Sequence, residues 1–162
     1  AVRPLRTCQN LGMRVHISTD HAAFETKQFL VAQLGERGYQ VIDHGATSLD
    51  PDDDYPDFII PCAEAVIADP GSLGIVLGGS GNGEAIAANK VPGIRAALAY
   101  NVETATLARE HNDARCLAMG GRMHSNAEAL EIALAFLTTA FSGNPRHQRR
   151  IDKITGYERG QS

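Results

Sequence analysis

Tryptophan is absent from this 162-residue sequence, and aromatic residues make up only 6% of it. There is no apolar run near the roughly 18 residues that a membrane-spanning helix needs. Residues 1–12 lack the apolar core of a secretory signal. Basic residues do not dominate, because 15 basic against 19 acidic residues give a net charge of −4, which disfavours a general attraction to nucleic acid. We therefore expect a cytoplasmic protein that binds neither membranes nor nucleic acid.

Cysteine is also scarce. Cys8, Cys62 and Cys116 are odd in number and have no spacing typical of metal sites. This pattern favours one thiol in an N-terminal tail and two small core residues over disulfides or a zinc site. No other group of ligands has metal-site spacing, so we expect neither a metal ion nor a cofactor.

The length and the hydrophobic content of 43% allow one well-buried core but not two ordinary domains. We expect residues 1–12 to form a flexible extension and residues 13–162 a single domain that includes a basic C-terminal tail. The acidic run DPDDD at 50–54 is typical of a solvated loop, since it lacks the glycine and the final glutamate of an EF-hand.

Short apolar segments alternate along the chain with segments of helical periodicity. The expected strands are at 14–19, 39–44, 73–78, 95–100 and 114–120. The expected helices are at 22–37, 56–69, 83–90, 102–111 and 125–140. This alternation predicts an α/β fold, namely a Rossmann-like (flavodoxin-like) doubly wound parallel sheet between two helical layers. We expect the strand order 2-1-3-4-5.

The segment LGIVLGGSGNGEAIAANK at 73–90 joins an expected strand to an expected helix through a glycine-rich turn. Backbone N–H groups at a helix N-terminus bind anions such as phosphate or an oxyanion. Ser80 and Glu84 add a hydroxyl and a carboxylate, which suggests proton transfer on a small phosphorylated molecule, although a simple tight connection would need the same glycines. Asp20 and His21 follow the first strand. Both motifs therefore lie at the carboxyl edge of the sheet, where doubly wound folds bind ligands.

Several short blocks of sequence occur in a defined order. They are DHA at 20–22, DYP at 54–56, GGSGNGEAIAANK at 78–90, REHN at 109–112, GGRMH at 120–124 and RHQRR at 146–150. Together they resemble type B ribose-5-phosphate isomerases, within the superfamily of ribose and galactose phosphate isomerases. The resemblance implies an aldose–ketose isomerase that interconverts ribose 5-phosphate and ribulose 5-phosphate through an enediolate.

The resemblance also implies the catalytic groups. One base removes a proton beside a carbonyl and returns it to the neighbouring carbon. Some family members use a cysteine before the glycine turn, whereas this chain has Gly78 there. Glu84 is then the implied base, as in the actinobacterial members. The other implied catalytic residues are Ser80, which holds the enediolate oxygen, and His111 and Asp20, which open the sugar ring.

The implied substrate-binding positions are His21, Tyr55, Gly79, Gly81, Asn82, Gly83, Asn112, Arg122, Arg146 and Arg150. The turn would hold the enediolate oxygen through its N–H groups, and the histidine and the arginines would hold the phosphate. Arg146 and Arg150 are four apart, on one face of any helix formed there. Without the resemblance, RHQRR would equally fit a solvated basic face, Tyr55 loop packing and His111 an ordinary helix end.

Ser18, Thr19 and Ala23 depart from the family pattern near the implied site. A six-carbon aldose phosphate is therefore an alternative substrate, and a non-catalytic sugar-phosphate sensor is an alternative function. The joint presence of Glu84, His111 and Asp20 favours catalysis, since binding alone needs only the cations and the glycine turn.

The predicted topology separates the implied catalytic groups. His111 and Asn112 follow a helix and precede the fifth strand, so they lie at the opposite edge of the sheet from Glu84, about 17–20 Å away. A two-fold homodimer, alone or as half of a dimer of dimers, would bring His111 of one chain to Glu84 of the other, as the resemblance also implies.

Overall fold

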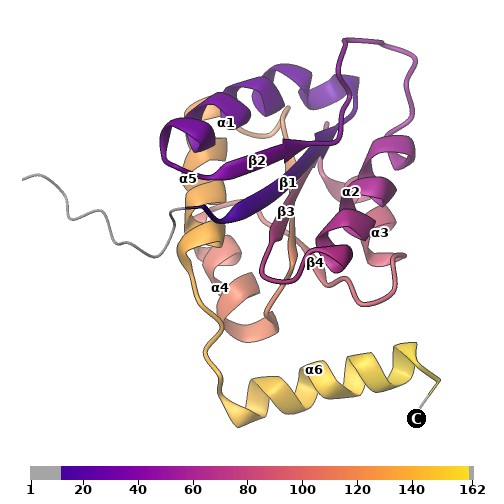
Figure 1. The fold of residues 1–162 in the computed structure, drawn as a ribbon, viewed down its shortest axis with the longest axis vertical. Coiled ribbons are helices and arrows are strands. Elements are labelled where there is room, and N and C mark those ends of the chain that lie inside the picture. The colour runs from indigo at the N-terminus through magenta and orange to yellow at the C-terminus, as the bar shows by residue number, and fades with distance from the viewer. Residues whose placement is uncertain (1–11, 161–162) are drawn as a thin grey trace, which may run out of the picture.

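The computed structural model describes residues 12–160 and contains a five-stranded parallel sheet between two layers of helices (Figure 1). The strands are β1 (Arg14–Thr19), β2 (Gln40–Asp43), β3 (Leu73–Gly78), β4 (Ala96–Leu98) and β5 (Cys116–Gly120). Each expected strand is present, and the predicted fold class is confirmed. Cys8 and all of the expected extension except Gly12 lie outside the described residues.

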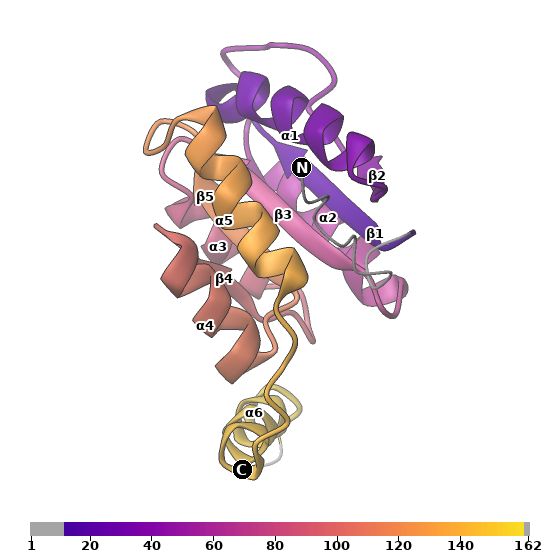
Figure 2. The same ribbon diagram turned by 90° about the vertical axis from the view of Figure 1, so that its left-hand side faces the viewer.

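The helices are η1 (His21–Ala23, a 3₁₀ turn), α1 (Phe24–Glu36), α2 (Pro56–Ala68), α3 (Asn82–Asn89), α4 (Val102–Asn112), α5 (Asn126–Thr138) and α6 (Pro145–Glu158). Helices α1, α4 and α5 cover one face of the sheet, and α2 and α3 cover the other (Figure 2). Local sequence features determine where several helices begin: Asn101 and Ser125 form capping boxes at α4 and α5, and Pro56 is the first residue of α2. Within residues 12–160, no helix has the length and apolarity needed to cross a membrane.

The expected strand order 2-1-3-4-5 is wrong at its last two positions. The observed order is β2-β1-β3-β5-β4, because β5 pairs with both β3 and β4. Every residue of β3 and β5 is buried, whereas all of β4 is only partly buried, and a short, half-buried strand suits the edge of a sheet. The chain passes from β3 across β5 to β4 and then returns from β4 to β5, so these two crossovers run in opposite directions along the sheet. Because both are right-handed, their helices, α3 and α4, lie on opposite faces.

Each face of the sheet has its own apolar core. Ile17 and Leu77 belong to the core under α1, α4 and α5, and Val76 belongs to the core under α2 and α3. Cys62 and Cys116 are buried free thiols in this second core, as the sequence predicts. Burial raises the pKa of Cys62 to about 12, so it remains a neutral core residue at physiological pH.

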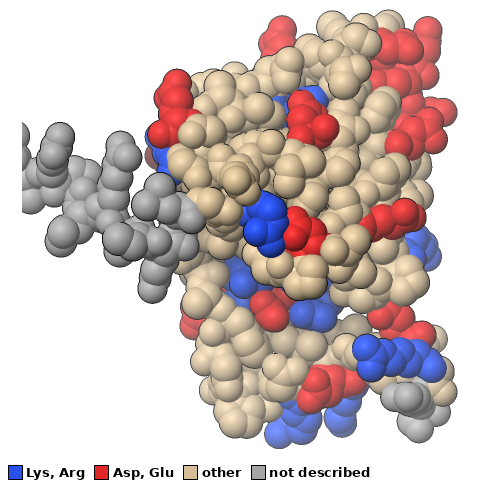
Figure 3. Space-filling model, viewed as in Figure 1, with Lys and Arg blue, Asp and Glu red and all other residues tan. Residues whose placement is uncertain are grey.

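Helix α6 lies outside the three layers of the domain (Figures 1 and 2), and near its C-terminal end Glu158 accepts a hydrogen bond from the N–H of Gly93 in the loop after α3. Among the helices and strands it contacts chiefly α4, and its only buried residue is Ile151. Tyr157 is 82% exposed, and Ile154 is exposed beside it on the next turn. Basic side chains gather along this helix at the bottom of the face shown in Figure 3. The sequence predicts a basic tail in this region, and the helix itself was not expected.

Candidate active site

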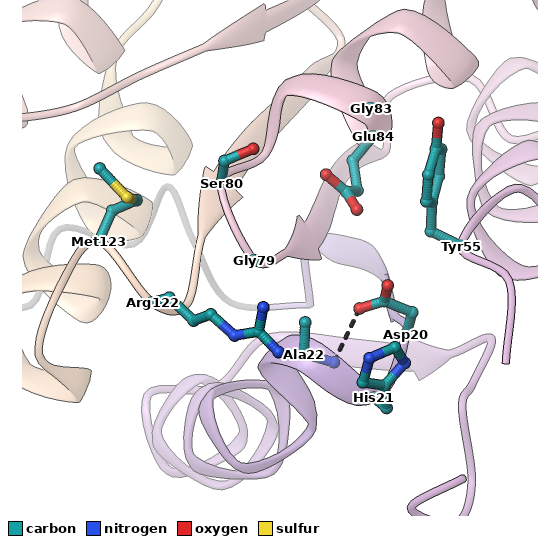
Figure 4. Close-up of a pocket in the computed structure, with 10 residues that line it drawn as sticks. All are labelled: Asp20, His21, Ala22, Tyr55, Gly79, Ser80, Gly83, Glu84, Arg122 and Met123. Carbon is teal, nitrogen blue, oxygen red and sulfur yellow. Dashed lines mark hydrogen bonds between the residues drawn. The ribbon is translucent and has the colours of Figure 1, made fainter. Parts of the chain in front are cut away.

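A pocket of about 490 Å³ opens at the carboxyl edge of the sheet (Figure 4). Its walls are the start of η1, the residue that precedes α2, the glycine turn after β3 and the loop after β5. It is lined by Asp20, His21, Ala22, Tyr55, Gly79, Ser80, Gly83, Glu84, Arg122 and Met123. The observed strand order explains this convergence, because β1, β3 and β5 are consecutive neighbours whose carboxyl ends meet. Eight of the residues named from the sequence line this pocket.

The glycine turn joins β3 directly to α3. Gly81 has a φ of 85°, a backbone angle that residues other than glycine rarely adopt, and this conformation directs the chain into the helix. The Ser80 hydroxyl oxygen accepts a hydrogen bond from the N–H of Asn82, the first residue of α3, at 3.2 Å, and Ser80 also lines the pocket. The loop after β5 is tied to the turn, since the N–H of Gly121 donates to the carbonyl of Gly78 at 2.7 Å.

Glu84 is the most enclosed ionisable group that lines this pocket, with an exposed fraction of 4%. Its carboxylate fills the space beside Gly78, where a Cβ would overlap it. Burial raises the pKa of Glu84, and the negative charge of Asp20 raises it further, while hydrogen bonds from backbone N–H groups partly oppose the shift. A carboxyl group with a raised pKa suits a general base that must also return the proton.

Asp20 and His21 enter the pocket from the end of β1. Asp20 is 6% exposed, and its side chain accepts a hydrogen bond from the N–H of Ala22 at 2.9 Å, which starts η1. Figure 4 shows its carboxylate facing the same space as that of Glu84. His21 contacts Asp53 of the acidic run, at 2.6 Å between Nδ1 and Oδ1. The expectation of a wholly solvated loop at 50–54 is therefore wrong for Asp53, whose side chain is 8% exposed.

Asp20, His21 and Asp53 place their potential ligand atoms within 4.8 Å of one another. They are the residues in the described part of the chain that could most readily hold a metal ion. The hydrogen bond to Asp53 already uses the Nδ1 of His21, and Asp20 already caps η1. Hydrogen bonds thus engage one atom of each side chain, while the buried Oδ2 of Asp53 has no hydrogen-bond partner, and we assign no metal to the cluster.

The other walls of the pocket are aromatic, cationic and apolar. The Tyr55 ring lies against Gly83, where a Cβ would be 2.6 Å from Cζ. Arg122 approaches Gly79 from the loop after β5. Met123 also lines the pocket but was not identified from the sequence, since a lone methionine in a loop carries no chemical pattern.

Six of the residues named from the sequence do not line this pocket. Gly81 and Asn82 form the turn behind it, and the other four, His111, Asn112, Arg146 and Arg150, lie on α4 and α6. The carbonyl of Asn112 accepts a hydrogen bond from Arg95, which precedes β4, so the end of α4 lies at the amino edge of the sheet. The His111 ring packs on that of His147 of α6, with 4.3 Å between centroids.

The fold and the pocket together define a doubly wound α/β protein whose pocket holds two carboxylates, Asp20 and Glu84, beside a glycine-rich turn. Residues 15–154 match the model of the Ribose/Galactose Isomerase family, and the chain belongs to that family.

Curated relatives cover nearly the whole chain. It is 63% identical over 147 residues to ribose-5-phosphate isomerase B of Mycolicibacterium paratuberculosis, covering 91% of this chain and 92% of the relative. It is 60% identical to the Mycobacterium tuberculosis protein of the same name, covering 91% of each chain.

Solved structures agree. Ribose-5-phosphate isomerase B of Clostridium thermocellum has a TM-score of 0.88 at 43% identity, over 93% of this chain and all (100%) of the other. The Mycoplasma genitalium enzyme with bound ribulose-5-phosphate has a TM-score of 0.88 at 38% identity, over 93% and 99% of the two chains.

Proposed function

We propose that this protein interconverts ribose 5-phosphate and ribulose 5-phosphate. The observation that carries the proposal is the buried Glu84 carboxylate, held beside an anion-binding turn in the space left by Gly78. The names of the relatives at 60–63% identity support this substrate.

The proposed chemistry is a proton transfer between two carbons. Glu84 removes the proton from C2 of the open-chain aldose and delivers it to C1. The hydroxyl proton passes from O2 to O1, so the C1 aldehyde becomes a hydroxyl and the C2 hydroxyl becomes the ketone. Negative charge develops on an oxygen in the enediolate. The Ser80 hydroxyl and the N–H groups of the turn stabilise that oxygen, and each such donor is worth about 3–4 kcal/mol in an oxyanion site.

Opening the sugar ring needs a second pair of groups. Asp20 lies in the pocket with Glu84, whereas His111 lies at the far edge of the same chain. We propose that His111 of a partner subunit completes the site, together with Asn112, Arg146 and Arg150 of that subunit. His21 and Arg122 would then contribute to phosphate binding from the pocket side, and Tyr55 would line the sugar.

The placement of α6 outside the three layers supports a homodimer. The helix carries two of the proposed phosphate ligands. It contacts its own domain through α4 and, near its C-terminal end, through the hydrogen bond from Gly93 N–H to Glu158, and it leaves Tyr157 almost fully exposed. A second copy would cover this surface and bring α6 to a pocket. We further propose a cytoplasmic location, since phosphorylated pentoses carry charges that keep them inside cells.

The test is an assay of the purified protein against a panel of pentose and hexose phosphates. Ribose 5-phosphate should be converted with the highest kcat/KM. Faster turnover of a six-carbon aldose phosphate would favour the alternative substrate. Tight binding of ribose 5-phosphate without turnover would favour a sensor.

A further inference from the structure

Asp53 differs from its acidic neighbours in the loop between β2 and α2. Asp52 and Asp54 are exposed, whereas the Asp53 side chain is 8% exposed and turns inward toward His21. An aspartate is rarely this buried unless its charge has a partner. Nothing in the sequence pattern separates Asp53 from the rest of the run.

One oxygen of Asp53 makes two contacts with His21. Oδ1 lies 2.6 Å from the ring Nδ1 and accepts a second hydrogen bond from the His21 backbone N–H at 3.0 Å. The first contact fixes the ring and the second fixes the backbone that carries it. Because Nδ1 is used, Nε2 is the ring nitrogen available to a ligand in the pocket.

We propose that Asp53 is a positioning residue that keeps His21 protonated and directs its Nε2–H toward the substrate phosphate. The proposal rests on the proposed function for the identity of the anion, but the His21–Asp53 pair itself does not depend on that identity. An imidazolium donates a stronger hydrogen bond to phosphate than a neutral ring does. The loop would thereby set the pH range over which the pocket binds a phosphorylated ligand.

The charges around His21 support this assignment. Its pKa is raised, chiefly by the hydrogen bond to Asp53 and further by the negative charge of Asp20, while partial burial and the positive charge of Arg122 oppose the shift. Glu84 lines the same pocket from α3. All of these groups except Asp53 belong to the proposed reaction machinery. A substitution of Asp53 can therefore change the protonation of His21 without removing a proposed catalytic or substrate-binding group.

The test compares Asp53→Asn with Asp52→Asn, an exposed matched control in the same loop. Asparagine keeps the shape and one oxygen acceptor but removes the charge. In Asp53→Asn, KM for ribose 5-phosphate should match wild type near pH 6 and rise about 10-fold by about pH 8, as His21 loses its proton, with kcat changing less. Asp52→Asn should follow wild type throughout. A KM increase of equal size at every pH would indicate general loosening and overturn the proposal.

A second measurement does not depend on activity. The His21 ring is titrated by NMR, with and without inorganic phosphate as the anion probe. In the wild type, its midpoint should lie above that of an ordinary histidine and rise further with phosphate; in Asp53→Asn it should fall. A wild-type midpoint at or below the ordinary value would overturn the proposal, even if the variant does not fold. An inactive wild type with the expected titration would overturn the proposed isomerase function alone.

Discussion

The carboxylate of Glu84 lies in the space that a side chain on residue 78 would occupy. Because glycine has no Cβ, Gly78 leaves this space free for the carboxylate.

Replacing Glu84 with glutamine should abolish most turnover. Glutamine keeps the shape of the side chain but cannot accept the proton, and a general base contributes about 10²–10⁴-fold to a rate. We expect kcat to fall by that factor while KM for ribose 5-phosphate changes little. Steady-state kinetics provide the check, and a variant with near-normal kcat would exclude Glu84 as the base.

Gly78→Ala should displace the base without removing it. Its added Cβ would overlap the end of a flexible side chain, so the Glu84 carboxylate must move while the backbone stays in place. A displacement of about 1 Å can cost 10²-fold in rate, and we expect a kcat loss of that order with the fold intact by circular dichroism. Gly35→Ala is the control, because nothing lies within 4 Å of the Cβ it would add. Equal kcat in both variants would contradict the close fit of Glu84.

The raised pKa of Glu84 has a consequence for stability. The folded protein binds this proton more tightly than the unfolded chain, so between the two pKa values the free energy of unfolding falls as pH rises. This loss of unfolding free energy is complete above the folded pKa and absent below the unfolded pKa. A difference of one between the two pKa values corresponds to about 1.4 kcal/mol. Glu84→Gln should therefore melt at a higher temperature than wild type near pH 8 but not near pH 4. The exposed Glu64→Gln is the control, and a variant less stable than wild type near pH 8 would refute this account.

Arg146→Ala and Arg150→Ala should weaken recognition of the phosphate. Each removes one charge-assisted contact worth about 1.5–3 kcal/mol, or roughly 10–100-fold in kcat/KM for ribose 5-phosphate. Turnover of unphosphorylated ribose should hardly change. Arg149→Ala, exposed on the same helix, is the matched control. Similar losses on both sugars would instead indicate a structural role for these arginines.

Mixing two nearly inactive variants tests whether the site is shared. After subunit exchange between Glu84→Gln and His111→Ala, half of the dimers should be mixed, each with one intact and one doubly damaged site. Activity should recover to roughly a quarter of wild type. Exchange can be followed by mass spectrometry of differently labelled subunits. Demonstrated exchange without recovery would mean that each site is built within one chain.

Most of the pocket residues that the sequence predicts lie just after a strand, whereas Tyr55 precedes α2 and was named only through the family resemblance. Ser80 and Glu84 come just after β3, and Asp20 and His21 just after β1, so their place at the carboxyl edge follows from the parallel sheet alone. Asp53 could not be found in this way. Its contact with His21 spans 32 residues and depends on the path of an irregular loop.

The strand order and α6 were missed for different reasons. The alternation of strands and helices is the same whether β4 or β5 lies at the edge, and the two orders are distinguished by the observed pairing of β5 with both β3 and β4. Helix α6 did leave signals in the sequence, namely the Asn144–Pro145 start and apolar residues at Ile151 and Ile154, three apart. The arginines around these residues are also typical of a solvated basic segment, so the sequence did not favour a helix there.

The placement of α6 outside the layers of its own domain would make catalysis depend on protein concentration. If sites are shared as proposed, a lone folded chain has the base but lacks most of the phosphate clamp, so dilution below the dissociation constant of the dimer removes activity without unfolding anything. A newly synthesised chain would likewise remain inactive until it forms a dimer with a second copy. Specific activity would then report the local abundance of this protein as well as its intrinsic rate.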